Sequence, residues 1–384
     1  ALALVGCAAP SRFALRPPVV RDGDDRPFAP APKASAESDY ANSADVILLR
    51  PISHFFLFEP SHEARNATSL DEVADSSWYT NRRPTPEEVA RGACTDEPAL
   101  PFVVKSSKGT GTTPDFVVKD AADRTYLMKL DDLGPRQPEI STAADAIVSR
   151  FYWALGFNAP CNRVLYVQEP HVRVDRRSVE KLRFGGERPL TEAGMLAALR
   201  RATRGPDGAY RVSTSRFIDG KPVGTWRTEG RRSDDPNDVI PHEDRRELRA
   251  ERLLAAWVAH WDSRGPNSFD AFVATHGQAG YVRHYFLDFS DALGGVPIRT
   301  EWPEPRMGFA TVSDVPRIAG DIVGLGLIRR PWDDVKADPR YPNLGYLDVA
   351  HFDPLGFAPQ TAMVRWARAD ASDLGWIARK IPRL

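Results

Sequence analysis

His260-Trp261-Asp262-Ser263-Arg264-Gly265-Pro266-Asn267 is followed in the chain by Tyr285-Phe286-Leu287-Asp288-Phe289-Ser290. The first stretch has the pattern of a helix that ends in a polar loop, and the second that of an apolar strand that ends in an acid. Asp262, Asn267 and Asp288 are therefore oxygen-bearing side chains at places where two elements stop. Such side chains can hold a divalent metal against the phosphates of a nucleotide and can face a hydroxyl acceptor.

A lysine and an acid upstream can complete such a site. Lys129 lies in a run that alternates like a half-buried strand, and a buried lysine needs a charged partner. The alternative is an edge lysine whose aliphatic stem is buried while its ammonium group reaches water. Glu139 and Asp145, at the start and inside a helix expected over residues 140–155, are the acids that could pair with Lys129. Glu139 also suits the N-terminus of that helix, where an acid is favourable. We assign the lysine-fixing role to Glu139.

Phosphoryl transfer depends mainly on positioning and charge neutralisation. It requires a lysine on the phosphates, an acid that fixes that lysine, metal ligands and a carboxylate beside the acceptor. The predicted catalytic residues are accordingly Asp262, Lys129 and Glu139, and the predicted metal ligands are Asn267 and Asp288.

Strand patterns cover residues 102–105, 116–119 and 125–130. A loop that contains glycine lies between the first two of these strands. Backbone N–H groups in such a loop can cover phosphates. We therefore assign Lys108, Gly109 and Gly111, together with Lys129, to nucleotide binding. The loop lacks the third glycine of a G-x-G-x-x-G motif, and a plain hairpin loop fits the same residues.

The ordered set resembles the atypical kinase-like families that include HipA, the spore-coat kinase CotH and the phosphatidylinositol 3/4-kinase-related proteins. It is more similar still to uncharacterised bacterial envelope proteins of this layout. The matching stretches are Tyr126-Leu127-Met128-Lys129, Ala154-Leu155-Gly156-Phe157-Asn158-Ala159-Pro160, Asp234-Asp235-Pro236-Asn237-Asp238, His260-Trp261-Asp262 with Asn267, and Leu287-Asp288-Phe289-Ser290.

This resemblance implies an α+β, bilobal, kinase-like fold. A small N-terminal antiparallel β lobe with one main helix would precede a larger, mostly helical C-terminal lobe. The implied cofactors are ATP and Mg²⁺, with Lys129 on the phosphates, Asp262 as the catalytic carboxylate, and Asn267 and Asp288 on the metal. The sequence departs from the pattern at Pro266, where HipA-type loops have lysine, and at Ser290, which replaces the glycine of Asp-Phe-Gly. These departures bear on activity rather than on fold.

The N-terminal sequence Leu4-Val5-Gly6-Cys7 resembles a bacterial lipobox, in which the cysteine is lipidated. We expect a lipid-anchored protein of the bacterial cell envelope, on the outer membrane or periplasmic face, attached to the membrane through Cys7; a chance run of small residues is the alternative. Cys94 and Cys161 could pair in that compartment, and two buried free cysteines are the other interpretation. The expected organisation is a signal-peptide remnant (1–7), a disordered tether (8–42), an extension packed on the first lobe (43–100), an N-lobe (101–209) and a C-lobe (210–384).

The net charge of the chain bears on which binding partners are expected. The net charge of -1 does not favour binding to nucleic acid. We expect a monomer whose phosphate acceptor, a protein, a lipid or a small molecule, is unknown.

Three other functions fit the same residues. A degenerate kinase fold could bind a nucleotide or a partner without transferring phosphate. His260, Asp262, His284 and Asp288 could form a hydrolytic or oxidative metal site, although His284 is more typical of a core histidine. The chain could also be a purely structural envelope lipoprotein.

Overall fold

The computed structural model is described over part of the chain. The described residues are 23–35, 44–45, 49, 62–68, 70–107, 115–131, 139–182, 186–205, 207–295, 308–311, 314–325, 327–341, 343–347 and 352–384.

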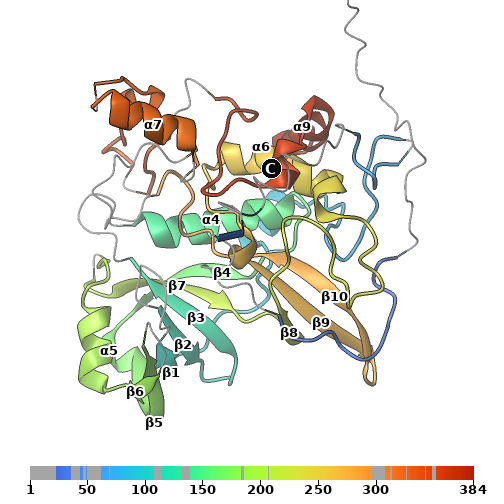
Figure 1. The fold of residues 1–384 in the computed structure, drawn as a ribbon. Coiled ribbons are helices and arrows are strands. Elements are labelled where there is room, and N and C mark those ends of the chain that lie inside the picture. Colours follow the sequence, from blue (N-terminus) through green and yellow to red (C-terminus); the bar gives the residue numbers. More distant parts are fainter. Residues whose placement is uncertain are drawn as a thin grey trace, which may run out of the picture.

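Within these residues the fold is α+β, as predicted, and its main sheet has seven strands (Figure 1). The strands are β1 (Phe102–Ser107), β2 (Asp115–Lys119), β3 (Thr125–Leu130), β4 (Asn162–Val167), β5 (Val172–Lys181), β6 (Glu187–Pro189) and β7 (Tyr210–Arg216). Their order across the sheet is β4-β7-β3-β2-β1-β5-β6. The predicted strands near 102, 116 and 125 are thus confirmed as β1, β2 and β3.

Two details of this sheet differ from expectation. The sheet is not wholly antiparallel, because β1 and β5 run parallel. The strand β7, expected to open the C-lobe at residue 210, pairs with β3 on one side and β4 on the other. The predicted boundary between the lobes therefore falls inside this sheet, and the bilobal division itself stays a prediction.

The two faces of β3 serve different purposes. Tyr126 and Met128 are buried in the apolar core that the sheet shares with α5 (Glu192–Leu199). Because side chains alternate along a strand, Lys129 points to the opposite face. That face is covered by α4 (Ile140–Ala154), which contacts β3, β4 and β7. Lys129 is therefore directed at a helix.

Gly156 ends α4. Its φ of +113° is accessible to glycine, and a Cβ there would lie 2.3 Å from the Tyr79 ring. Tyr79 forms a backbone bridge with Phe157, and its ring lies 5.2 Å from the Trp376 ring at a tilt of 55°. The segment that precedes the main sheet thus packs against the helical part of the molecule as well, and not on the first lobe alone.

The second part of the chain combines a small sheet with helices. The sheet has the order β10-β9-β8, with β8 at Lys221–Gly224, β9 at Ser268–His276 and β10 at Ala279–Phe286. The helices are α6 (Arg246–Trp257), α7 (Val315–Val323), α8 (Val364–Ala367) and α9 (Ala371–Ala378), after the short α3 (Pro86–Arg91) earlier in the chain. α6 packs against both α8 and α9. None of the helices described has the length and apolarity needed to cross a membrane.

Pro241 and the acids after it have the local pattern of a helix start, but the helix does not begin there. A 3-10 turn at His242–Asp244 comes first, and α6 begins only after Arg245, whose backbone is extended. Arg245 turns its guanidinium over the Trp78 ring at 5.0 Å and towards Asp238 at 3.7 Å. These tertiary contacts outweigh the local helical pattern. Trp257, the last residue of α6, is 40% exposed.

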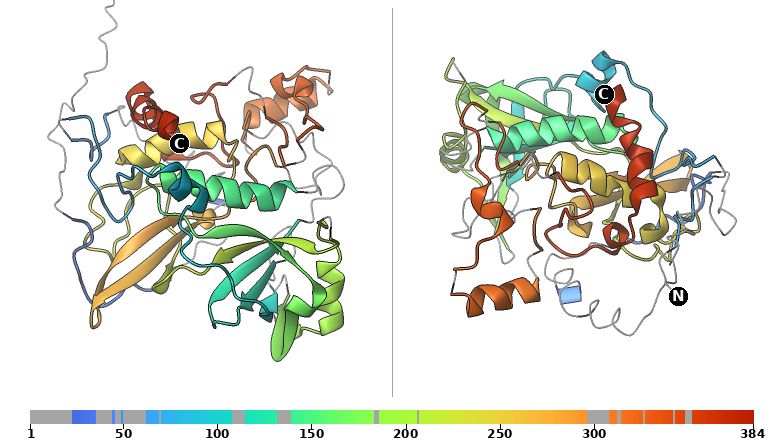
Figure 2. Two further views of the ribbon diagram at one scale, coloured as in Figure 1. Left: turned by 180° about the vertical axis from the view of Figure 1, so that it is seen from behind. Right: turned by 90° about the horizontal axis from the view of Figure 1, so that it is seen from above.

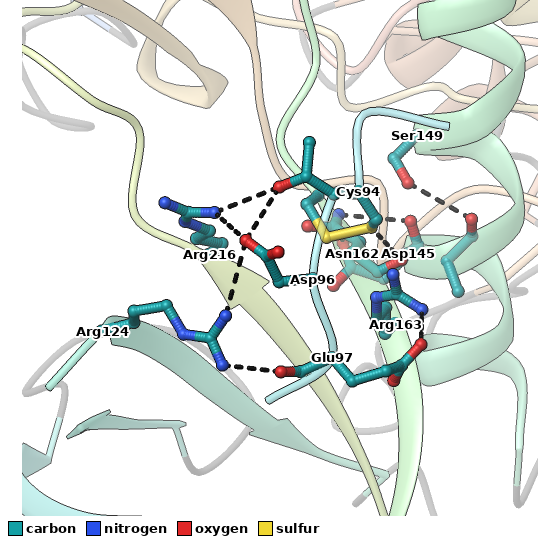
Figure 3. The surroundings of a disulfide bond; sticks show 12 residues. Cys94, Asp96, Glu97, Arg124, Asp145, Ser149, Asn162, Arg163 and Arg216 are labelled. Atoms are coloured by element: carbon teal, nitrogen blue, oxygen red, sulfur yellow. Dashed lines mark hydrogen bonds and ion pairs between the residues drawn. A yellow bond between two sulfur atoms is a disulfide. The ribbon is translucent and has the colours of Figure 1, made fainter. Parts of the chain in front are cut away.

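A disulfide joins Cys94 to Cys161 and ties the preceding segment to the start of β4 (Figure 3). The neighbouring Asp96 pairs with Arg124 at 3.5 Å and with Arg216 at 3.3 Å. Asn162, which follows Cys161, donates a hydrogen bond from its amide to Asp145 Oδ1 at 3.0 Å. The disulfide therefore lies one residue away from a side chain that holds an acid of α4.

Replacing both cysteines, as Cys94→Ser with Cys161→Ser, should lower the free energy of unfolding by about 4 kcal/mol. The bond spans 67 residues, and a cross-link over such a loop reduces the conformational entropy of the unfolded chain. Urea titration of the oxidised proteins measures the difference. Cys7→Ser is the matched control and should leave stability unchanged; equal stability of the double variant and the parent would show that the bond contributes nothing.

A buried cluster of ionisable groups includes His284 of the small sheet. Trp78 stacks on the His284 ring with centroids 3.6 Å apart, and His242 lies edge-on to Trp78 at 4.6 Å. His242 Nε2 contacts Asp238 Oδ2 at 2.9 Å, and its Nδ1 contacts the Arg227 carbonyl. Burial opposes protonation of His242, but Asp238 and this carbonyl outweigh it and raise its pKa.

The raised pKa of His242 predicts how stability depends on pH. A group whose pKa is higher in the folded state stabilises the fold below its unfolded pKa, about 6.5, and loses that contribution as pH rises through the folded value. The free energy of unfolding should therefore fall above neutral pH in the parent, and His242→Gln should remove that part of the decline. The exposed His276→Gln is the control. Identical pH profiles for parent and His242→Gln would contradict the prediction.

Candidate active site

Lys129 lies between two carboxylates that come from distant parts of the chain. Its Nζ is 2.8 Å from Asp288 Oδ1 and 3.5 Å from Asp145 Oδ1. The lysine is only 5% exposed, so it needs such partners. Burial opposes its charge, but Asp145, Asp288 and Asp115 outweigh burial and raise the pKa of Lys129. The expectation that this lysine has a charged partner is confirmed.

Asp145, rather than Glu139, is the helix acid that contacts Lys129. Glu139 occupies the N-cap position of α4, and its Oε2 lies 3.4 Å from Arg211 Nη1 on β7. Asp145 lies further along α4, on the side that faces β3, where Asn162 and Ser213 also hydrogen-bond to its carboxylate. The lysine-fixing role assigned to Glu139 is thus corrected by the position of the two acids on the helix.

Asp288 has an unusual backbone conformation. Its φ of +54° is uncommon for a residue other than glycine, although aspartate and asparagine adopt it more readily than most. Ser290 Oγ donates to Asp288 Oδ1 at 2.6 Å. The side chain is 30% exposed. Neighbouring residues thus hold this acid in a costly conformation with its carboxylate open to a ligand, as is common at functional sites.

The loop from His260 to Asn267 lies beside Asp288. The backbone N–H of Leu287 donates to the Asn267 carbonyl at 2.9 Å, which fixes the end of the loop against the end of β10. Asn267 in turn donates its side-chain amide to Asp262 Oδ2 at 2.9 Å and to the Asp262 carbonyl at 2.8 Å. Of the predicted residues, the structure therefore brings Lys129, Asp262, Asn267 and Asp288 together.

Asp262 is buried, and Arg264 Nε donates to its Oδ1 at 2.6 Å. Burial and the charge of Asp288 raise the pKa of Asp262 to about 6, although Arg264 and Asn267 act in the opposite direction. A carboxylate of this kind is ionised at neutral pH and has enough basicity to accept a proton from a hydroxyl group.

Glu251 on α6 supports the loop from His260 to Asn267 through buried hydrogen bonds. Its carboxylate accepts hydrogen bonds from Tyr152, Ser263, Arg365 and Trp366, at 2.5 Å, 2.8 Å, 3.0 Å and 2.6 Å respectively. Arg365, fully buried, also donates to the Ser263 carbonyl at 2.8 Å. The residue next to Asp262 is thereby fixed by helices α6 and α8 together.

Asp291 was not identified from the sequence. It is half-buried, and burial together with the charges of Asp262 and Asp288 raises its pKa to about 8. Its position three residues after Asp288 was the available signal. Asp262, Asp288 and Asp291 are thus the acids near the cations Lys129 and Arg264. Lys129 also pairs with Asp145.

This donor set fits a magnesium ion bound with a nucleotide. Across the described residues, no group of three His, Cys, Asp or Glu side chains has the geometry to hold a metal. Mg²⁺ in phosphotransfer sites is usually held by one or two protein oxygens, with the remaining ligands from phosphates and water. Asp288 and the side-chain oxygen of Asn267 can provide those two.

The alternative histidine-based metal site is not formed. His284 Nδ1 bonds to Asp270 Oδ1 at 2.7 Å, and the ring is stacked on Trp78, as in a core histidine. His260 Nδ1 contacts the Tyr152 hydroxyl at 2.9 Å, and burial lowers the pKa of His260 to about 4. His260 and His284 thus have different partners, and the two do not form a shared metal site with Asp262 and Asp288 in the part of the chain that the structure describes.

Lys108, Gly109 and Gly111 lie outside the described residues. A cavity of about 1070 Å³ lies elsewhere, between residues 28–35 and the loop at 225–236, and none of the predicted site residues lines it.

No family model matches the chain, and neither does any curated protein. Two solved structures are similar to it, the crystal structure of the Golgi casein kinase and the crystal structure of the Golgi casein kinase with Mn/ADP bound. The first is 12% identical and covers 77% of this chain and 74% of its own, with a TM-score of 0.28. The second is 12% identical and covers 78% and 75%, with a TM-score of 0.29. At these TM-scores the likeness decides nothing about this chain, whose function has to be inferred from its own residues.

Proposed function

We propose that this protein is an ATP- and Mg²⁺-dependent phosphotransferase of the atypical kinase type. The observation that carries the proposal is the position of Lys129 between Asp145 and Asp288, with Asp262 and Asn267 beside Asp288. A clamped lysine, a metal-binding acid and a second carboxylate are the parts that phosphoryl transfer requires.

Each residue has a distinct role in this proposal. Lys129 binds the nucleotide phosphates while Asp145 fixes its position. Asp288 and Asn267 hold Mg²⁺, which neutralises charge that develops on the phosphates. Asp262 accepts the proton of the acceptor hydroxyl. The acceptor can be a protein, a lipid or a small molecule.

A second candidate is a nucleotide-binding protein that does not transfer phosphate. Arg264 and Asn267 engage both carboxylate oxygens of Asp262, which is the observation that favours it. In this case Asp262 would be structural and the lysine clamp would still bind the nucleotide.

We also propose an envelope location with a lipid on Cys7, a residue outside the described part of the chain. The disulfide between Cys94 and Cys161 supports this location, since structural disulfides form mainly in oxidising compartments.

Calorimetry of the purified protein with ATP tests the proposal. We expect binding with Mg²⁺ and its loss when EDTA removes the metal. Release of ADP, or transfer of the labelled γ-phosphate to the protein itself, distinguishes the transferase from the binding protein. No binding at millimolar ATP with Mg²⁺ would rule out both candidates.

A further inference from the structure

The first turn of α4 is capped by a residue of another element. The N-cap residue, Glu139, does not cap the helix with its own side chain. Asp131, which directly follows β3, accepts instead from the backbone N–H of Thr142 at 2.9 Å and from the Thr142 hydroxyl at 2.5 Å. A carboxylate is favourable at this end of a helix. The cap therefore joins α4 to the strand that carries Lys129.

Arg211 of β7 fixes this cap from a third element. Its Nε donates to the Thr142 hydroxyl at 2.8 Å and lies 3.4 Å from Asp131 Oδ2. Its Nη1 donates to the Tyr166 hydroxyl at 3.0 Å and lies 3.4 Å from Glu139 Oε2. Thr142 is 1% exposed, Asp131 3% and Arg211 8%. One buried guanidinium group thus binds both the helix and the residue that caps it.

The contact between Lys129 and Asp145 repeats the same arrangement. Asp131 lies two residues after Lys129, so both side chains point to the face of the sheet that α4 covers. Asp145 lies three residues after Thr142, so both lie on the side of α4 that faces the sheet. β7 contributes again, because Ser213 pairs with Lys129 in the sheet and its Oγ donates to Asp145 Oδ2 at 3.1 Å. We call Asp131, Thr142 and Arg211 the outer layer, and Lys129, Asp145 and Ser213 the inner layer.

Between β3 and α4 the outer layer is the tighter contact. It contains hydrogen bonds of 2.5 Å, 2.8 Å and 2.9 Å, whereas Lys129 Nζ is 3.5 Å from Asp145 Oδ1, at the limit of a hydrogen bond. α4 lies against the main sheet (Figures 1 and 2), and three residues of helix span only about 4.5 Å. A movement of the cap along β3 is therefore carried to Asp145, and a shift of about 1 Å would break the contact with Lys129.

We propose that Asp131, Thr142 and Arg211 are positioning residues that hold Lys129 against Asp145 and thereby support nucleotide binding. The outer layer does not contact the phosphates and acts only through the placement of α4. Its effect on nucleotide affinity rests on the proposed function, whereas its effect on Lys129 does not. Loss of the groups that orient a binding residue commonly weakens binding by about 10–100-fold.

Acylation of Lys129 tests the outer layer without a nucleotide. N-hydroxysuccinimide acetate reacts with an amine only when the amine is accessible, and Lys129 is buried and ion-paired, so the parent should react slowly at this position. Arg211→Met removes the guanidinium group and should raise the rate at Lys129 by about tenfold or more. Thr142→Val keeps both charges of the outer layer and removes only the hydroxyl, so it gives the same test with less effect on folding. Mass spectrometry of the peptide that contains Lys129 measures the rates.

Arg232→Met is the matched control. The Arg232 side chain is 10% exposed, as is that of Arg211, and it pairs with Asp234 at 2.9 Å and with Asp270 at 3.2 Å instead of with α4. Arg232→Met should react at Lys129 as the parent does. In calorimetry with ATP and Mg²⁺, Arg211→Met should bind about tenfold more weakly or worse, and Arg232→Met should bind as the parent does.

Parental acylation rates in both Arg211→Met and Thr142→Val would overturn the inference. An equal increase in Arg232→Met would also contradict it, because general loosening of the fold would then explain the rates. Faster acylation of Lys129 with unchanged ATP affinity would show that the outer layer does not support nucleotide binding. A parent that binds no ATP would remove the proposed function alone, since the acylation rates still decide whether the outer layer holds Lys129.

Discussion

Asp288→Asn should abolish the binding of ATP with Mg²⁺, with affinity at least about 100-fold weaker, because the substitution removes a proposed metal ligand and the nearer of the two carboxylates on Lys129. Asparagine keeps the shape of the side chain and tolerates the φ of +54° at this position. A loss of binding would therefore reflect the missing charge rather than a strained backbone. Calorimetry at millimolar ATP measures the effect.

The chain contains a close control for this variant. Asp123 has a φ of +62° and pairs with Lys119 at 2.7 Å, so it shares both the backbone conformation and the lysine partner of Asp288. It is 83% exposed and lies outside the site. Asp123→Asn should bind nucleotide as the parent does. Nucleotide binding by Asp288→Asn at parental affinity would remove Asp288 from the metal site.

Asp262→Asn should leave nucleotide binding intact and slow phosphate transfer by about 10²–10⁴-fold, which is the usual contribution of a positioned general base. The parent should also lose activity as pH falls below about 6, because the pKa of Asp262 is raised to about 6 by burial and by Asp288, and only the ionised form accepts a proton. Initial rates of ADP release across pH 5 to 8 measure both effects.

Asp175→Asn serves as the control for Asp262→Asn. Asp175 pairs with Lys105 at 2.8 Å on the main sheet. Loss of the Asp175 charge should not change the rate of phosphate transfer. A parent without turnover at any pH, together with unchanged ATP binding, would favour the protein that binds a nucleotide without transferring phosphate. Equal rates for the parent and Asp262→Asn would show that another group accepts the proton.

The sequence pattern predicted the parts of the site that depend on local order. The alternation around Lys129 identified a buried lysine, and the polar residues after two apolar runs identified Asp262, Asn267 and Asp288 as neighbours. Strand ends and helix ends are local properties, so periodicity locates them well.

Periodicity in the sequence could not decide whether Glu139 or Asp145 pairs with Lys129. Both acids are within reach of Lys129 along the chain, and the outcome depends on which side of α4 faces β3. Arg211, on a strand that is distant in sequence, pairs with Glu139, whereas Asn162 holds Asp145. These long-range partners leave no signal in the local pattern.

Several strands, among them β5 and β8, were not predicted, for a related reason. β5 is rich in charged residues and has an irregular burial pattern, because it lies near the edge of its sheet with much of its surface exposed. β8 has four residues, two of which are exposed. Strands that bury little surface show little alternation, and only their hydrogen-bonded neighbours define them.

The contacts of Glu251 have a consequence for the timing of maturation during synthesis. Arg365 fixes the carbonyl and hydroxyl of Ser263, although the two residues are 102 positions apart. On the ribosome, the loop emerges long before its support does. The site can reach its final geometry only once the chain through α8 has left the exit tunnel, so a nascent chain stalled before α8 should be unable to transfer phosphate even though every proposed catalytic residue has already been made.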